Sequence, residues 1–109
     1  MPDIKKTYTE DGNTRSAVIG IDENVVGLNQ FNTLNDVVNR EMNEGIKSFT
    51  FDMSELKSIN SSGLGILISC LKNIKSSNGT LKVINANEKI LNVFKLTKLD
   101  NVFEFERAS

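Results

Sequence analysis

The amino-acid sequence predicts an α/β fold: one domain in which a mixed β-sheet of about four to five strands packs against three or more α-helices. Strand-like segments alternate with helical segments of about ten to fifteen residues, which is typical of strands joined by right-handed helical crossovers. The length of 109 residues suits a single domain. A hydrophobic content of 39% is sufficient for one small core, so we expect residues 1–109 to form one domain.

The first part of the chain is predicted to form a β-hairpin. Ile4 to Tyr8 has the composition of a short edge strand, and the Asp-Gly pair within Glu10 to Asn13 is a strong turn signal. The next segment, Ser16 to Ile21, contains the unbroken apolar run Ala17 to Ile19. Such a run is typical of a strand buried on both faces, which we expect here.

A helix followed by a strand is predicted next. Apolar residues recur at helical spacing, namely at Phe31, Leu34, Val37, Val38 and Met42. Asn29 offers a capping side chain before this helix, and Gly45 can adopt the left-handed conformation that ends it. From Phe49 to Met53 the pattern changes to an alternation with aromatic residues and threonine, which favours a strand.

A second helix is predicted from Gly63 onward. Its apolar residues recur at Leu64, Leu67, Ile68, Leu71 and Ile74. The pair Asn78-Gly79 is typical of a helix end. Because ligand and partner sites in such folds lie after the carboxyl ends of strands, the segment from Met53 to Ser62 is the first place to look for a site.

The last elements are a strand, a third helix and a short final strand. Leu81 to Ile84 is the strand. Asn85-Ala86-Asn87-Glu88 resembles a capping box, which opens a helix that runs through Ile90, Leu91 and Phe94. Val102 to Phe105 is predicted to return as the final strand.

Composition excludes several classes of function. The sequence contains no histidine, so a Ser-His-Asp triad, a Cys-His pair and a histidine-ligated metal are ruled out. The single cysteine, Cys70, cannot form an internal disulfide and is expected to be a small core residue. A net charge of -1 lacks the basic footprint of a nucleic-acid-binding protein. We therefore expect no enzymatic activity, cofactor, metal or nucleic acid.

No apolar run approaches the roughly 18 residues that a membrane span requires, and the first residues are polar rather than signal-like. We therefore expect a cytoplasmic protein without membrane insertion.

The segment Ile59 to Leu67, with the sequence INSSGLGIL, is the least ordinary in the chain. Its two serines, Ser61 and Ser62, stand where a helix begins. One interpretation is structural, because serine is a favoured capping residue and glycine permits a sharp entry into a helix. The other is functional: a helix N-terminus favours negative charge, so a phosphate on Ser61 or Ser62 would be tolerated there. Residue types alone leave both open.

This segment, together with Phe51-Asp52-Met53-Ser54 before it, resembles the signature of STAS domains and of the bacterial anti-sigma factor antagonists among them. The resemblance is specific from about Ser48 to Phe105 and includes a third helix similar to that of the family. The family usually has Asp where Asn60 stands, and often has Gly where Lys98 stands.

The resemblance implies a partner switch. It places phosphorylation at Ser61, carried out by an anti-sigma factor that is also a serine kinase, and removal of the phosphate by a PP2C-type phosphatase. The unphosphorylated protein would bind the kinase and release it when phosphorylated. The partner-binding residues implied are Asn60, Ser61, Ser62, Gly63 and Leu64. Asp52 would fix the adjoining loop through backbone hydrogen bonds.

Two alternatives remain at this stage. The first is a constitutive STAS scaffold that assembles with other proteins or a transporter and is never phosphorylated. The second is a ligand-binding or enzymatic module that uses Asp52 and Ser61, although no suitable general base accompanies the serine. The start of a dinucleotide fingerprint at Gly63-Leu64-Gly65 lacks its third small residue and does not favour a cofactor.

Overall fold

The computed structural model describes residues 6–11, 14–22 and 31–106. Within them the chain forms the predicted α/β domain, with a five-stranded mixed sheet and three helices. The elements in chain order are β1 (Lys6–Asp11), β2 (Thr14–Gly20), α1 (Phe31–Asn43), β3 (Ser48–Asp52), α2 (Ser61–Ser76), β4 (Thr80–Ile84), α3 (Glu88–Leu96) and β5 (Glu104–Glu106).

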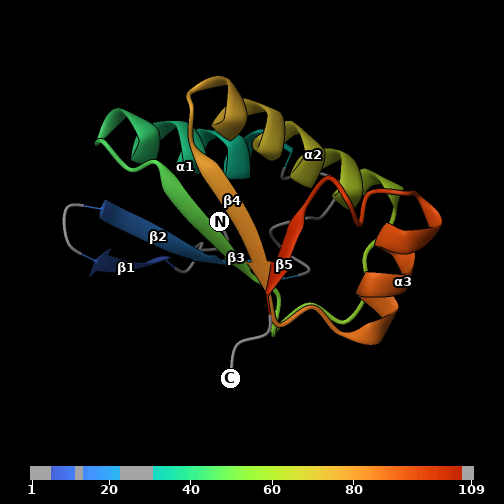
Figure 1. Cartoon of the computed structure of the whole chain (residues 1–109). Helices are drawn as coiled ribbons and strands as arrows, with labels where there is room; N and C mark the ends of the chain where they lie inside the picture. Colours follow the sequence, from blue (N-terminus) through green and yellow to red (C-terminus); the bar gives the residue numbers. More distant parts are fainter. Residues whose placement is uncertain (1–5, 12–13, 23–30, 107–109) are drawn as a thin grey trace.

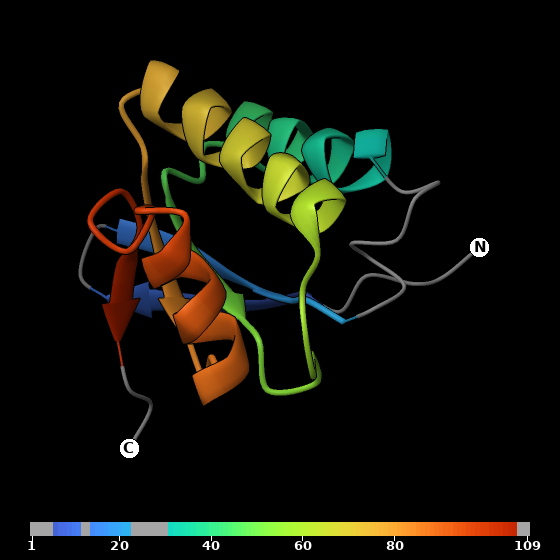
Figure 2. The same ribbon diagram turned by 90° about the vertical axis from the view of Figure 1, so that its right-hand side faces the viewer.

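The sheet has the strand order β1-β2-β3-β4-β5. β1 pairs antiparallel with β2, which confirms the hairpin, and the three pairs that follow are parallel. Each parallel pair is joined through a helix. From β2 onward each new strand pairs on the same side of the strand before it. Right-handed crossovers therefore place all three helices on the same face of the sheet. Figures 1 and 2 show α1 and α2 side by side over that face and α3 beside β5.

The strand β2 is buried on one face only, so the prediction of burial on both faces is wrong. Ala17, Ile19 and Ile21 are buried, whereas Ser16 and Val18 are half-buried. The alternation continues across the sheet. The buried residues Phe49 and Phe51 in β3 pair with Ala17 and Ile19, and on their other side they pair with the buried Leu81 and Val83 of β4. The helices cover this face, and the opposite face carries mostly polar side chains.

The core lies between the sheet and the helices. Its largest side chains with almost no exposed surface include Phe49, Phe51, Phe94, Ile19, Leu34 and Leu67. A cluster of three aromatic rings, Phe94, Phe103 and Phe105, packs α3 against the end of the sheet, with ring centroids 5.0–6.5 Å apart. This cluster holds α3 against β5, the edge strand of the sheet.

Polar contacts join α1 to α2. The side-chain amide of Asn35 donates to the Ser69 hydroxyl at 2.9 Å, and that of Asn73 donates to Asn39 Oδ1 at 2.6 Å. The donors and acceptors are one helical turn apart on each helix, so the contacts repeat along the pair. They fix the position of α2, whose first turn carries the two serines.

All three helices end in the same way, with a residue in the left-handed conformation and a hydrogen bond that closes the last turns. Gly45 (φ 96°) ends α1 as predicted, but Asn78 (φ 62°) rather than glycine has this conformation after α2, and Lys98 (φ 62°) after α3. The closing bonds run from Ile46 N to Glu41 O (3.1 Å), Gly79 N to Ile74 O (2.9 Å) and Leu99 N to Phe94 O (2.8 Å).

The boundaries differ from the prediction at the end of the chain. The residue that caps α3 is Asn87, not Asn85 as a capping box would require, and α3 therefore begins at Glu88. The final strand is Glu104–Glu106 instead of Val102 to Phe105, since residues 100–102 form a turn. Ile4, the turn residues Gly12 and Asn13, and the predicted cap Asn29 lie outside the described residues.

Candidate functional site

The start of α2 is built around Asn60. This residue has an extended backbone (φ -105°, ψ -178°), and its side-chain oxygen accepts a hydrogen bond from the Gly63 N–H at 2.9 Å. Its carbonyl oxygen accepts the first intrahelical bond, from the Leu64 N–H at 3.0 Å. These are the two features of an N-cap residue. Asn60 therefore satisfies one of the donors that a helix N-terminus leaves without an intrahelical acceptor.

The two serines occupy the first turn of α2 and point away from the core. Ser61 and Ser62 are exposed, as is Asn60, whereas Gly63 and Leu64 are buried. The interpretation of the serines as helix caps is wrong, because Asn60 provides the capping oxygen. Of the five residues predicted to bind a partner, three lie on the surface, and the other two hold the helix start against the core.

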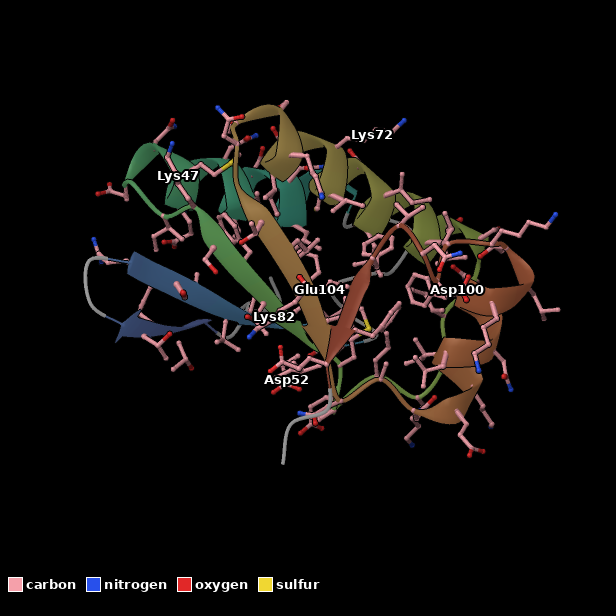
Figure 3. All side chains as sticks on the ribbon, in the orientation of Figure 1. Lys47, Asp52, Lys72, Lys82, Asp100 and Glu104 are labelled. Carbon is pink, nitrogen blue, oxygen red and sulfur yellow. The ribbon has the colours of Figure 1, made fainter. Side chains whose placement is uncertain are left out.

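Asp52 lies at the carboxyl end of β3, at the opposite end of the strand from Lys47 (Figure 3). Its Oδ1 accepts hydrogen bonds from the Ser54 N–H and from the Asn85 side-chain amide, both at 3.0 Å. Partial burial acts to raise the pKa of the Asp52 carboxyl, but the hydrogen bonds from Asn85 and Ser54 outweigh it and hold the pKa below its ordinary value. An ionised Asp52 thus holds the first residues of the segment that leads to Ser61.

Sequence reasoning missed a second set of contacts to this segment. The side-chain amide of Asn87 donates to the Lys57 carbonyl at 2.9 Å and contacts the Leu56 carbonyl at 3.3 Å. The Asn87 oxygen meanwhile accepts from the Ile90 N–H at 2.9 Å, which caps α3. The two asparagines after β4, Asn85 and Asn87, indicated a polar turn that could contact a neighbouring loop. Only the register of β3 with β4 shows that this loop is the one after β3.

The site offers few groups for chemistry. No group of three His, Cys, Asp or Glu residues that could hold a metal occurs among the described residues. Cys70 lies inside α2, where burial raises the pKa of its thiol to about 12, so it is a protonated core residue near neutral pH. In the described part of the chain no helix is long and apolar enough to cross a membrane.

The chain belongs to the STAS domain family, whose model matches residues 9–109. Two relatives from Thermotoga species match part of it. A protein of Thermotoga maritima named "Putative anti-sigma factor antagonist" is 36% identical over 61 residues, and a homologue from Thermotoga neapolitana is 30% identical over 61 residues. Each alignment covers 56% of this chain and 54% of the relative, so the match spans about half the length of each relative.

Solved structures show the same fold. The NMR structure of the protein TM1081 superposes with a TM-score of 0.79 at 24% identity, covering 93% of this chain and 79% of that one. The anti-sigma factor antagonist SpoIIAA in its unphosphorylated form superposes with a TM-score of 0.72 at 12% identity, covering 96% of this chain and 89% of that one. At these identities the structural likeness concerns the fold.

Proposed function

We propose that this protein is a cytoplasmic regulator of a bacterial partner-switching pathway. In this proposal the unphosphorylated protein binds an anti-sigma factor that is also a serine kinase, and phosphorylation of Ser61 releases it. A PP2C-type phosphatase resets the switch. Family membership and the names of the two relatives support the general role. The protein is the substrate and the ligand in this cycle, not a catalyst.

The observation that carries the proposal is the exposed Ser61 hydroxyl in the first turn of α2. Because Asn60 caps the helix, the hydroxyl has no part in holding the helix and is available to a kinase. A phosphate added there would lie at the positive end of the helix dipole, which stabilises negative charge by about 0.3–1 kcal/mol at a surface. Modification would therefore leave the fold intact and change the surface.

The change in charge at that surface is large for this protein. A phosphoserine carries about -1.5 to -2 charges near neutral pH, against a net charge of -1 for the whole chain. We propose that Asn60, Ser61 and Ser62 contact the partner directly, while the buried Gly63 and Leu64 place them. A phosphate at the centre of that contact would oppose binding to an apolar or acidic surface, and each penalty of about 1.4 kcal/mol weakens affinity tenfold.

The test is phosphorylation of the purified protein by extract of the source cells with ATP. We expect the intact mass to rise by one phosphate, mapped to Ser61. Ser61→Ala should abolish the mass change, and the matched control Ser62→Ala, one residue along the same exposed turn, should keep it. A phosphate that maps elsewhere would reject the assignment to Ser61, and no phosphate in any growth condition would reject the switch and favour a constitutive scaffold.

Binding provides a second measurement. With the kinase recovered from that extract, Ser61→Ala should bind as tightly as the unmodified protein, and Ser61→Asp should bind at least about tenfold more weakly if a charge opposes the contact. Equal affinity of the two variants would contradict a charge-driven release.

A further inference from the structure

The segment between β3 and α2, residues 53–60, leads directly to Ser61 and is held at two points by the turn that follows β4. Of the two asparagines on either side of Ala86 in that turn, Asn87 directs its side-chain amide at this segment, and Asn85 directs its amide at Asp52, the residue just before the segment. At the first point, Asn85 donates to Asp52, which also accepts the Ser54 N–H. At the second, Asn87 reaches the carbonyls of Leu56 and Lys57.

The second point is the one nearer to Ser61. Leu56 is only 2% exposed, and its N–H bonds to the Met53 carbonyl at 3.1 Å, so this part of the segment is anchored in the core. Lys57, Ser58 and Asn60 are exposed. The Asn87 amide therefore holds the segment where it leaves the core, at Leu56 and Lys57, and the partly buried Ile59 packs against the core again just before the cap of α2.

We propose that Asn87, assisted by Asn85, is a positioning residue for the phosphorylation site: its amide keeps residues 56–60 in one arrangement, so that the kinase meets Ser61 already in place. This inference rests on the proposed function of Ser61. Ordering the segment in advance spares the kinase the entropy cost of ordering it during binding. The amide of Asn87 acts on affinity for the kinase, while the transfer of phosphate occurs at Ser61 itself.

Asn87 has two roles that one substitution separates. Asn87→Asp keeps an oxygen that accepts the Ile90 N–H, and Asp caps helices as well as Asn does. The variant loses the amide donor and directs a carboxylate at two carbonyls instead. The matched control is Asn92→Asp, which makes the same change of charge at an exposed position of α3.

The experiment compares both variants with the unmodified protein in two assays. Amide hydrogen exchange reports the order of residues 54–60 without any kinase, and we expect it to become about tenfold faster in Asn87→Asp, since one lost hydrogen bond changes an opening equilibrium by up to about that factor. Exchange within β3 and β4 should not change. Asn92→Asp should resemble the unmodified protein.

Steady-state phosphorylation with the kinase purified from source-cell extract provides the second assay. We expect KM for Asn87→Asp to rise by about three- to tenfold and kcat to stay within about twofold, because ordering costs affect binding. A purely structural role would reduce the folded fraction of this substrate, which raises KM counted on total protein and leaves kcat unchanged. KM is therefore calculated on the folded concentration, measured by circular dichroism under the assay conditions, and a purely structural role would leave that KM unchanged. Unchanged exchange and unchanged KM, or a fall in kcat alone, would overturn the inference.

Failure of the proposed function would look different. If the unmodified protein accepts no phosphate, the role of Ser61 is rejected and positioning for a kinase falls with it, whereas the exchange data still show whether Asn87 orders the segment. If Asn87→Asp does not fold, Asn87→Ser serves in its place, because serine supplies a capping oxygen and has no side-chain amide.

Discussion

Replacing Asn60 with alanine removes the side-chain oxygen that caps α2 and leaves the Gly63 N–H without its 2.9 Å partner. Loss of an N-cap side chain destabilises a protein by about 1 kcal/mol. For a domain of this size that corresponds to a fall in the melting temperature of about 4–8 °C. Asn60 is exposed, so water will replace part of the lost bond, and the expected fall lies near the lower end of that range.

Asn60→Asp is the informative partner of that variant, because it retains the capping oxygen and restores the residue that the family usually has. Its carboxylate adds a favourable interaction with the helix dipole of about 0.3–1 kcal/mol. Near neutral pH we expect Asn60→Asp to be the most stable of the three proteins, the unmodified protein to come second and Asn60→Ala to be the least stable. Because the dipole lowers the pKa of this carboxyl in the folded state, the advantage of Asn60→Asp should be complete above the ordinary carboxyl pKa of about 3.9 and be lost as pH falls through the lower folded-state pKa.

Thermal unfolding followed by circular dichroism, near neutral pH and at acidic pH, measures this order. Ser58→Ala is the control, since Ser58 is an exposed residue two positions before the cap and its change should leave the melting temperature almost unaltered. If Asn60→Ala unfolds at the same temperature as the unmodified protein, the capping bond contributes nothing. If Asn60→Asp is the least stable of the three near neutral pH, the electrostatic reasoning is refuted.

Three further predictions concern positions outside the site. Gly79→Ala should destabilise the fold by about 1–3 kcal/mol in urea titration, because its methyl group would lie 2.8 Å from both the Ile74 side chain and the Lys47 carbonyl oxygen. The control Gly65→Ala, whose methyl group meets nothing within 4 Å, should be neutral or stabilising. Equal effects of the two substitutions would contradict this reasoning. Lys98→Gly should stabilise the protein by about 0.5–1 kcal/mol in the same assay, because its φ of 62° suits glycine; a loss of stability would show that the left-handed backbone costs nothing here. Tyr8 is the only tyrosine in the sequence, so ultraviolet absorbance follows the ionisation of its hydroxyl alone. The hydrogen bond to Glu41 and, to a lesser extent, burial raise the pKa of Tyr8 above 10.0. The midpoint of its titration should therefore lie at a higher pH in the folded protein than in urea. Because the pKa of Tyr8 is raised by folding, the stabilisation from its contact with Glu41 is complete below the unfolded-state pKa and is lost as pH rises through the folded-state pKa. Equal titration midpoints in the folded protein and in urea would exclude the contact.

Much of the fold was predictable because its signals are local. The helix in which Ser61 stands follows from apolar spacing over a few turns, and the hairpin from an Asp-Gly turn between two extended segments. The end of α1 at Gly45 was predicted for the same reason. The least reliable predictions concerned boundaries, as at β5, where the aromatic contacts of Phe103 and Phe105 with Phe94 determine which residues pair with β4.

The candidate site was predictable in part. The sequence indicated Ser61 and Asp52 through its resemblance to STAS domains, and the structure places Asp52 at the end of β3 and Ser61 at the start of α2. It left open whether the serines cap the helix or offer their hydroxyls for modification, since a helix N-terminus suits both. The structure assigns the capping role to Asn60 and so separates the hydroxyls from the helix cap.

By itself the sequence determined the order of strands and helices, the hairpin and the exposed serine turn, because each depends on residues close together in the chain. The tertiary structure alone decided that the three described helices cover the same face of the sheet, since this depends on the direction in which successive strands are added. It alone decided that Asn85 reaches Asp52 and that Asn87 reaches Lys57, at sequence separations of 33 and 30 residues. Contacts at that separation exist only once the register of β3 and β4 brings their carboxyl ends together.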